Sequence, residues 1–439
     1  MGDSLNKPFV TVIGAGLAGV EASYQLAKRG IPVRLYEMKK LHHSPAHQSD
    51  AFAELVCSNS FRSDAIENAV GLLKAELRLL DSVVMRIADI NRVPAGTSLA
   101  VDRIAFSDQL TEIIRHHPLI DVFDAEMCVI PDGEVIIATG PLTSEPLFAD
   151  LKKVTGEDTL YFFDAAAPVI MGDSIDMTIA YQKSRYDKGE ASYRNCPMTK
   201  GEYDHWYNEL VKAQCVIPKD YELKVFEGCM PFEEMAKRGR ETLLYGPMKP
   251  VGLEMPSGIQ PYAVVQLRMD DIFGKLYNIV GFQTHLTFSE QLRIVRMIPG
   301  LANAKIVRYG VMHKNTYINA PKIIDECYQI KKEPRIFIAG QLSGVEGYVE
   351  SVGSGMIAAL NMVRRITKEP KLVFPRETAL GAQAYYLANT SPSCFQPMNI
   401  NHGLFPELGG KHHKKDRKAL YAQRSIGIIK NMMEAHLFD

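Results

Sequence analysis

The sequence predicts an α/β fold in which a Rossmann-like domain is interrupted by an inserted α+β domain. Residues 9–37 read as a buried strand, a glycine turn, an amphipathic helix and a second strand. Two further apolar strands, at 135–140 and 335–340, each end in glycine. Between them, residues 171–305 carry more aromatic residues, more prolines and shorter alternating runs. This change of character predicts the insertion.

The expected division of the chain is 1–170, 171–305 and 306–439, with the first and last segments forming one domain. A chain of 439 residues is too long for one ordinary core, which agrees with this division. Residues 38–68 lack helical or strand periodicity and predict a long ordered loop, a kind that is often functional. The other expected elements are strands at 9–13 and 33–37, helices at 18–29, 69–89, 106–117 and 354–367, and a mostly helical tail from 376 with a loop at 392–415.

Composition excludes several classes of protein. Hydrophobic residues make up 46% and charged residues 23%, as in globular proteins, and no apolar run is long enough to span a bilayer. No segment reads as a signal peptide, so we expect a cytoplasmic protein that has no membrane partner. The formal net charge is −1, so any RNA-binding face must be a local patch, and we expect no DNA partner.

Cysteine and histidine spacing predicts no metal site. Seven cysteines are scattered along the chain, and no two form a CxxC arrangement. This disfavours a disulfide framework and a zinc site and favours a reducing compartment. Adjacent histidines at 42–43, 116–117 and 412–413 point in different directions on a helix or strand, and no carboxylate stands nearby at ligand spacing.

The glycine turn reads GAGLAG and has the context that a dinucleotide-binding fingerprint requires. Gly14 permits the tight turn, Gly16 lets the backbone approach a pyrophosphate, and Gly19 lets the helix pack on the strand. The helix then points its unpaired N–H groups at the phosphates, and Glu37 ends the next strand where a ribose hydroxyl binds. The alternative is a βαβ turn without a ligand. The cofactor contacts expected here are Gly14, Ala15, Gly16, Leu17, Ala18, Gly19 and Glu37.

The far end of the chain favours FAD over NAD. A late strand ends in Ala339-Gly340-Gln341, and further glycines follow at 347, 353 and 355. In two-part flavoproteins such a strand leads to a helix whose N-terminus points at the flavin, and a nicotinamide-only enzyme would not need this second glycine-rich turn. The fold expected is therefore a Rossmann-like FAD-binding domain with an inserted α+β domain. Gly140, Gly340, Gln341 and Gly353 are the further cofactor contacts expected.

Four segments occur together and in order: ELVCSNSFR at 54–62, FEGCMP at 226–231, GFQTH at 281–285 and AGQLSGVEGY at 339–348. With them the sequence resembles the bacterial folate- and FAD-dependent tRNA (uracil-5-)-methyltransferases, the TrmFO family. The resemblance runs from residue 9 to at least 355. It is more specific than the glycine turn, because three of the four segments lie outside the generic flavin fold.

The resemblance implies a methylene transfer to the T-loop uridine of tRNA, at position 54, on carbon C5. The implied cofactor is FAD. The implied co-substrates are 5,10-methylenetetrahydrofolate, as the carbon donor, and NADH or NADPH, as the reductant. The oligomeric state is left open.

Two cysteines are the catalytic candidates. Uracil C5 becomes nucleophilic only after a group adds at C6, and a thiolate is suited to that addition. Cys229 lies between Gly228 and Pro231, which enforce a specific backbone path, and the family resemblance implies that it is the nucleophile. Cys57 lies in the long loop, and the same resemblance implies an auxiliary role near the flavin. For each, the alternative is a buried structural cysteine.

His285 follows an apolar strand, so we expect it to emerge at the strand end. The resemblance implies that its ring stacks on the folate pterin. The RNA contacts expected are Arg62 and three residues of the densest basic run of the chain, Lys411, Lys414 and Lys415. A solvated charged face is the alternative for that run.

Four other functions remain open from the sequence. The same chemistry on ribosomal RNA is one. A flavin oxidoreductase acting with NAD(P)H on a small molecule would explain the glycines but not Cys229 or the insertion. A flavin scaffold of the GidA type would modify the wobble uridine of tRNA, but that family has a longer helical C-terminal region. A non-enzymatic RNA-binding flavoprotein is the fourth.

Overall fold

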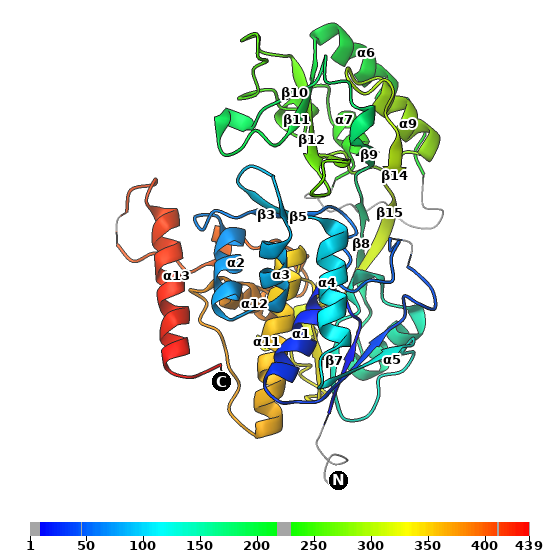
Figure 1. Ribbon diagram of the computed structural model, residues 1–439. Helices are drawn as coiled ribbons and strands as arrows, with labels where there is room; N and C mark the ends of the chain where they lie inside the picture. The colour runs from blue at the N-terminus through cyan, green and yellow to red at the C-terminus, as the bar shows by residue number, and fades with distance from the viewer. Residues whose placement is uncertain (1–8, 45, 217–229, 411, 439) are drawn as a thin grey trace.

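The chain builds two main sheets with separate apolar cores, shown in Figure 1 by a computed structural model that describes residues 9–44, 46–216, 230–410 and 412–438. The first sheet is parallel throughout, and its central strand β1 pairs with β2 and β7. All four residues of β1 are buried, as expected for a strand covered on both faces. In spatial order the strands are β16 (Ile336–Ile338), β7 (Glu134–Ile137), β1 (Val10–Ile13), β2 (Val33–Glu37) and β6 (Ile120–Asp124).

Helices α1 (Leu17–Lys28) and α11 (Tyr348–Thr367) pack closely because glycine lets their backbones approach. A Cβ on Gly355 would lie 2.3 Å from the carbonyl oxygen of Ala18. The prediction that α11 starts at residue 354 was wrong, since it begins six residues earlier and contains Gly353. Gly353 and Gly355 therefore allow close packing of the helix and do not form a turn.

One predicted helix, 69–89, is two helices in the structure, α2 (Ala69–Leu79) and α3 (Val83–Ile90). Between them Asp81 adopts a left-handed backbone conformation with φ 56°. The Ser82 hydroxyl accepts the N–H of Met85 and so caps α3, and it donates to buried Glu21 at 2.6 Å. Apolar periodicity continues across this break, which is why the pattern alone suggested one helix.

The other helices of this part are α4 (Arg103–Arg115), α5 (Glu145–Thr155), α10 (Ala320–Ile323), α12 (Ala379–Asn389) and α13 (Arg417–Glu434). A small sheet, in the order β3 (Ser60–Ser63), β5 (Ser98–Val101) and β4 (Arg92–Val93), lies beside them. Among the described residues, no helix combines the length and the apolar character needed to cross a membrane.

The second sheet is antiparallel and forms the upper part of Figure 1. Its core gathers around Trp206, which is fully buried and packs against Phe232 and Phe282. In spatial order its strands are β10 (Tyr181–Gln182), β11 (Arg194–Met198), β12 (Ala263–Met269), β13 (Leu276–Ile279), β9 (Val169–Met171) and β14 (Ile306–Arg308). Its helices are α6 (Lys200–Leu210), α7 (Phe232–Lys237), α8 (Thr242–Tyr245) and α9 (Phe288–Arg296).

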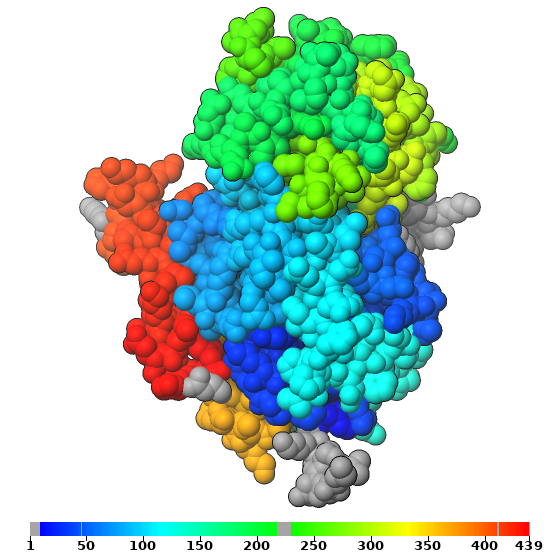
Figure 2. All heavy atoms as spheres, viewed as in Figure 1, coloured from blue at the N-terminus to red at the C-terminus, as the bar shows by residue number. Residues whose placement is uncertain are grey.

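Two antiparallel strands connect the two parts, β8 (Leu160–Ala165) and β15 (Met312–Tyr317). The chain enters the second part through β8 and leaves it through β15. The space-filling view shows the second part seated directly on the first (Figure 2). The division at 170/171 and 305/306 stays a prediction, and the neighbouring strands β9 and β14 lie at these positions.

A buried carboxylate fastens the C-terminal helices to the first part. Glu76 of α2 is fully buried and accepts the N–H groups of Ala379 at 2.6 Å and Leu380 at 2.9 Å, which begin α12. It also accepts the hydroxyl of Ser425 on α13. Burial raises the pKa of Glu76 to about 7, although the three hydrogen bonds oppose that rise.

This raised pKa predicts a pH-dependent stability. The pKa of Glu76 in the folded protein lies above its value in the unfolded chain. Protonated Glu76 therefore contributes its full stabilisation of the fold below about pH 4.5, and this contribution is lost as the pH rises toward 7. The free energy of unfolding should therefore fall by up to about 3 kcal/mol across this window. In Glu76→Gln the fall should be smaller, as measured by urea unfolding at several pH values. Glu67→Gln, at an exposed position nearby, is the control, and equal slopes in both variants and the wild type would contradict the assignment.

Candidate cofactor site

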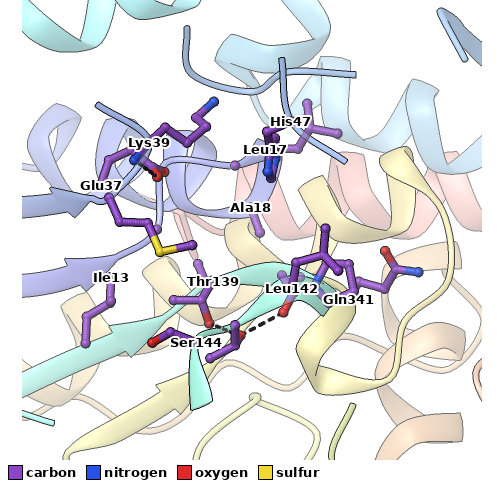
Figure 3. Close-up of a pocket in the computed structure, with 18 of the residues that line it drawn as sticks. Ile13, Leu17, Ala18, Glu37, Lys39, His47, Thr139, Leu142, Ser144 and Gln341 are labelled. Carbon is purple, nitrogen blue, oxygen red and sulfur yellow. Dashed lines mark hydrogen bonds between the residues drawn. The ribbon is translucent and has the colours of Figure 1, made fainter. Parts of the chain in front are cut away.

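A pocket opens at the carboxyl ends of β1, β2 and β7, where parallel sheets commonly bind ligands. Its empty volume, including space open to solvent, is about 1070 Å³. Figure 3 shows Glu37 and Gln341 on opposite sides of it, with Leu17 and Ala18 between them. The predicted cofactor residues that line it are Gly14, Gly16, Leu17, Ala18, Glu37, Gly140, Gly340 and Gln341.

The three glycines of the turn are required for different reasons. Gly14 has φ +97°, and a Cβ there would lie 2.6 Å from the carbonyl oxygen of Ala138. A Cβ on Gly19 would lie 1.8 Å from the carbonyl oxygen of Gly14, so Gly19 is needed for helix packing and does not line the pocket. Among the described residues, a Cβ on Gly16 would meet no atom within 4 Å. The fold itself does not require glycine at 16, which leaves close approach of a ligand as the reason for it.

The beginning of α1 is suited to bind phosphate. Gly16 is its N-cap residue, and no side chain caps the helix. The first N–H groups of a helix have no partner within it, and with the helix dipole they attract an anion. A pyrophosphate therefore fits the space beside Gly16.

Glu37 lies at the end of β2, as predicted, and is 9% exposed. Its carboxylate accepts the N–H of Ala15 at 2.8 Å and the N–H of Lys39 at 3.0 Å. Ala15 therefore orients Glu37 and does not itself line the pocket. Each carboxylate oxygen keeps a lone pair, so Glu37 remains able to accept a ribose hydroxyl.

The opposite end of the pocket is formed by two glycines in the left-handed region, Gly140 with φ +69° and Gly340 with φ +74°. Gln341 follows, and its side-chain amide donates to Glu346 at 2.7 Å. Burial, followed by the charge of Asp164, raises the pKa of Glu346 well above its usual range. Gly353 lies inside α11 instead, where a Cβ would lie 3.0 Å from the side chain of Leu380.

Several lining residues were not predicted. Lys39 is 4% exposed and donates to the carbonyl oxygen of Ala51, and burial lowers its pKa. Burial, together with the charge of Lys39, lowers the pKa of His47 to about 3, so His47 is neutral at physiological pH. Both belong to the segment 38–68, which was predicted to be a loop throughout but contains β3 near its end. Its length and irregularity were the only signal that it lines a site. Thr139, Thr143 and Tyr348 also line the pocket.

Cys57 is partly buried and does not itself line the pocket, whereas its neighbour Val56 and its partner Tyr348 do. Its N–H donates to the hydroxyl of Tyr348 at 2.9 Å, and its Sγ lies 3.9 Å from the carbonyl oxygen of Ala165. The structure thus places Cys57 against Tyr348, which lines the pocket, and an auxiliary role at the flavin stays a prediction. Cys229 lies outside the described residues.

His285 is not at a strand end, since β13 ends at Ile279 and the histidine is six residues further along the chain. It is 4% exposed and does not line the pocket. Its Nδ1 lies 3.5 Å from Glu233 and its Nε2 lies 3.2 Å from Glu234. Burial lowers the pKa of His285, whereas Glu234 opposes that shift. Pterin stacking stays a prediction.

One group of metal-ligand type occurs in the described part of the chain, namely Cys215, Glu233 and His285. The carboxylate of Glu233 already accepts the N–H of His285 at 2.6 Å and the hydroxyl of Thr284 at 3.0 Å. Burial raises the pKa of Cys215 to about 11, so its thiol is neutral without a cation. The sequence prediction of no metal stays a prediction.

The RNA-contact candidates occupy two kinds of environment. Arg62 forms an ion pair with Glu350, whose side chain is fully buried in α11. Lys414 and Lys415 are exposed just before α13, and Lys411 lies outside the described residues. The structure therefore gives Arg62 a structural partner and leaves Lys414 and Lys415 accessible.

The fold and this pocket define a Rossmann-type, FAD-binding flavoprotein of the GidA-like class. A family model described as glucose inhibited division protein A matches residues 9–370. The chain belongs to the TrmFO family of methylenetetrahydrofolate–tRNA-(uracil-5-)-methyltransferases. It is 57% identical to the TrmFO of Bacillus licheniformis over 426 residues, covering 96% of this chain and 98% of that protein. It is 55% identical to the TrmFO of Bacillus subtilis over 431 residues, covering 98% of this chain and 99% of that protein.

A solved structure shares the fold at low sequence identity. The GidA of Aquifex aeolicus, in its form II crystal, superposes with a TM-score of 0.70 at 13% identity. The match covers 98% of this chain and 74% of that one. The form I crystal gives a TM-score of 0.70 and 14% identity, and the match covers 98% of this chain and 79% of that one. The match leaves 26% and 21% of the two GidA chains uncovered, which agrees with the prediction that a GidA-type chain is longer than this one.

Proposed function

We propose that this protein methylates C5 of the T-loop uridine of tRNA, at position 54, using FAD and 5,10-methylenetetrahydrofolate. NADH or NADPH is the proposed reductant. The observation that carries the proposal is the 54–57% identity to proteins named for this reaction, over at least 96% of the chain. The space beside Gly16 supports the FAD part of it.

In this proposal each candidate residue has a distinct role. Bound FAD would supply electrons and carry the carbon unit between folate and uracil. Gly16 and the start of α1 would bind its pyrophosphate, and Glu37 would bind a ribose hydroxyl. Cys229 would add to uracil C6, and Cys57 would act as an auxiliary group at the flavin end. Exposed Lys414 and Lys415 would contact the RNA backbone.

Label from methylenetetrahydrofolate should enter unmodified tRNA as 5-methyluridine when the purified protein and NAD(P)H are present. Label from S-adenosylmethionine should not, because the carbon would come from the folate. The measurement is nucleoside analysis of the tRNA, with a tRNA that carries cytidine at position 54 as the matched control. Label in that control tRNA would place the target elsewhere. Labelling of ribosomal RNA but not tRNA would support the ribosomal alternative, and NAD(P)H oxidation without any RNA label would support a small-molecule oxidoreductase.

A further inference from the structure

The loop around Cys57 is held at two consecutive carbonyl groups by arginines from different parts of the fold. Arg103 of α4 donates to the carbonyl oxygen of Leu55. Arg308 of β14, in the second sheet, donates to the carbonyl oxygen of Val56 at 2.8 Å. A guanidinium hydrogen bond to a carbonyl oxygen is charge-assisted and therefore stronger than a neutral one. The two peptide groups that precede Cys57 are thereby fixed.

The backbone N–H groups of the next two residues bind a third part of the fold, the start of α11. The Tyr348 hydroxyl accepts the N–H of Cys57 at 2.9 Å and the N–H of Ser58 at 3.2 Å. The side chain of Asn59, fully buried, donates to the carbonyl oxygen of Met269 at 2.9 Å and accepts from Arg268 at 3.1 Å. Both of these partners belong to β12 of the second sheet. Five consecutive residues therefore have partners outside the loop.

The second sheet also holds Arg103 in place. Asp270, 5% exposed and directly after β12, accepts both remaining arms of Arg103 at 3.1 Å and 2.9 Å. Burial alone would lower the pKa of Arg103, but Asp270 outweighs it and keeps the guanidinium charged. Such a bidentate pair has a fixed geometry. The position of the Leu55 carbonyl is thus linked to the second sheet.

The backbone is strained on both sides of the segment 55–59. Ala53 has φ 50° and Arg62 has φ 63°, a backbone region that residues other than glycine rarely adopt. Such strain persists only where the surroundings determine the conformation.

We infer that Arg103, Asp270 and Arg308 are positioning residues for the Cys57 thiol, through which the second sheet sets where this thiol lies at the cofactor pocket. The inference rests on the proposed function for the role of Cys57, but the positioning itself is measurable without methylation. Removing the arginine contacts should free the loop, change the reactivity of this one thiol and slow methylation without weakening folate binding.

The test compares Arg308→Met, Arg308→Lys, and a double variant, Arg103→Met with Asp270→Leu, against the wild type. The double variant removes both members of the buried ion pair, so no unpaired charge stays buried. The control is Arg293→Met, on α9 of the second part, whose partners are Glu209 and Glu290. The FAD-loaded proteins are treated with iodoacetamide, and the alkylation rate of each cysteine is read by peptide mass spectrometry. Methylation of tRNA is measured in parallel as kcat and as KM for methylenetetrahydrofolate.

We expect the alkylation rate of Cys57 to rise about 5- to 10-fold in Arg308→Met and in the double variant, since a loosened loop exposes the thiol more often. Arg308→Lys should fall between Arg308→Met and the wild type. We expect kcat to fall about 10-fold with KM changed by less than about 3-fold, as for a group that acts on the reacting complex. Exposed Cys394 should react at an unchanged rate, and fully buried Cys196 should stay unreactive.

Unchanged Cys57 alkylation in both Arg308→Met and the double variant would overturn the inference. So would parallel exposure of Cys196, because the arginines would then support the whole fold rather than this loop. A wild type that places no label in tRNA would reject the proposed function alone, and the alkylation rates would still decide whether the second sheet positions Cys57.

Discussion

Gly16→Val is expected to purify as a folded but colourless protein, without the yellow absorbance of bound FAD. The substitution is compatible with the described part of the protein, because a Cβ at this position meets none of its atoms within 4 Å and the backbone is extended, with φ −72° and ψ −175°. The added side chain instead fills the space proposed for the pyrophosphate. Forcing a bulky group into an occupied site costs about 3 kcal/mol, so affinity for FAD should fall at least about 100-fold.

The matched control is Gly201→Val, at an exposed glycine in α6 whose Cβ also meets no neighbour within 4 Å. It should keep its FAD. Far-UV circular dichroism and thermal unfolding of both apo-proteins check that the fold is intact, and titration with FAD measures the affinity. Gly19→Val should behave differently and fail to fold, because its Cβ would lie 1.8 Å from a backbone oxygen. A Gly16→Val protein that binds FAD as tightly as the wild type would refute the proposed pyrophosphate site.

Cys229→Ala is expected to keep FAD and its reduction by NAD(P)H, yet to lose RNA methylation by roughly 10³-fold or more, as for removal of a nucleophile. In the proposed reaction the thiolate adds to C6 of uracil, and C5 then bonds to the one-carbon unit. Loss of the C5 proton and of the carrier of the carbon unit leaves a methylene group on C5, and a hydride that NAD(P)H would provide through FAD converts it to methyl as the thiolate departs. The alanine variant lacks only this addition, so flavin chemistry should continue.

Transfer RNA containing 5-fluorouridine distinguishes the two cysteines. Fluorine cannot leave C5 as a proton does, so the wild type should retain a stable covalent adduct, visible as a shifted band on a denaturing gel. Cys229→Ala should form none, while Cys394→Ala, at an exposed cysteine, should resemble the wild type. An adduct in Cys229→Ala but not in Cys57→Ala would reverse the two roles. Adducts and methylation in both single variants would exclude thiol addition as the way uracil is activated.

The glycine turn was predictable from sequence because its information is local. Gly14, Gly16, Gly19 and Glu37 span 24 consecutive positions and belong to one strand–helix–strand unit, so their spacing can be read from a short stretch of sequence. The break at Asp81 was not predictable in this way, because Ser82 is fixed by Glu21, a buried residue of another helix.

The contacts that fix Cys57 could not be predicted for a similar reason. Arg103 and Arg308 are far from Cys57 along the chain, and an arginine that binds a buried carbonyl leaves no pattern in the sequence. Gly353 was misassigned because glycine is read as a turn signal, whereas here it lies on a helix packed against its neighbours. The surroundings of His285 were not predictable either, because its buried ring lies beside Glu233 and Glu234 of α7, about 50 residues earlier in the chain.

The order of strands in the first sheet has a consequence for synthesis on the ribosome. Strand β7 pairs with β16, yet about 200 residues separate them in the chain, and the whole second sheet is made in between. At about 5–20 residues per second, β7 emerges roughly 10–40 s before its partner. During that interval Val135, Ile136 and Ile137, all buried in the finished protein, form an open apolar edge. The second sheet has its own core and can fold meanwhile, so the nascent chain needs protection at this one edge until β16 arrives.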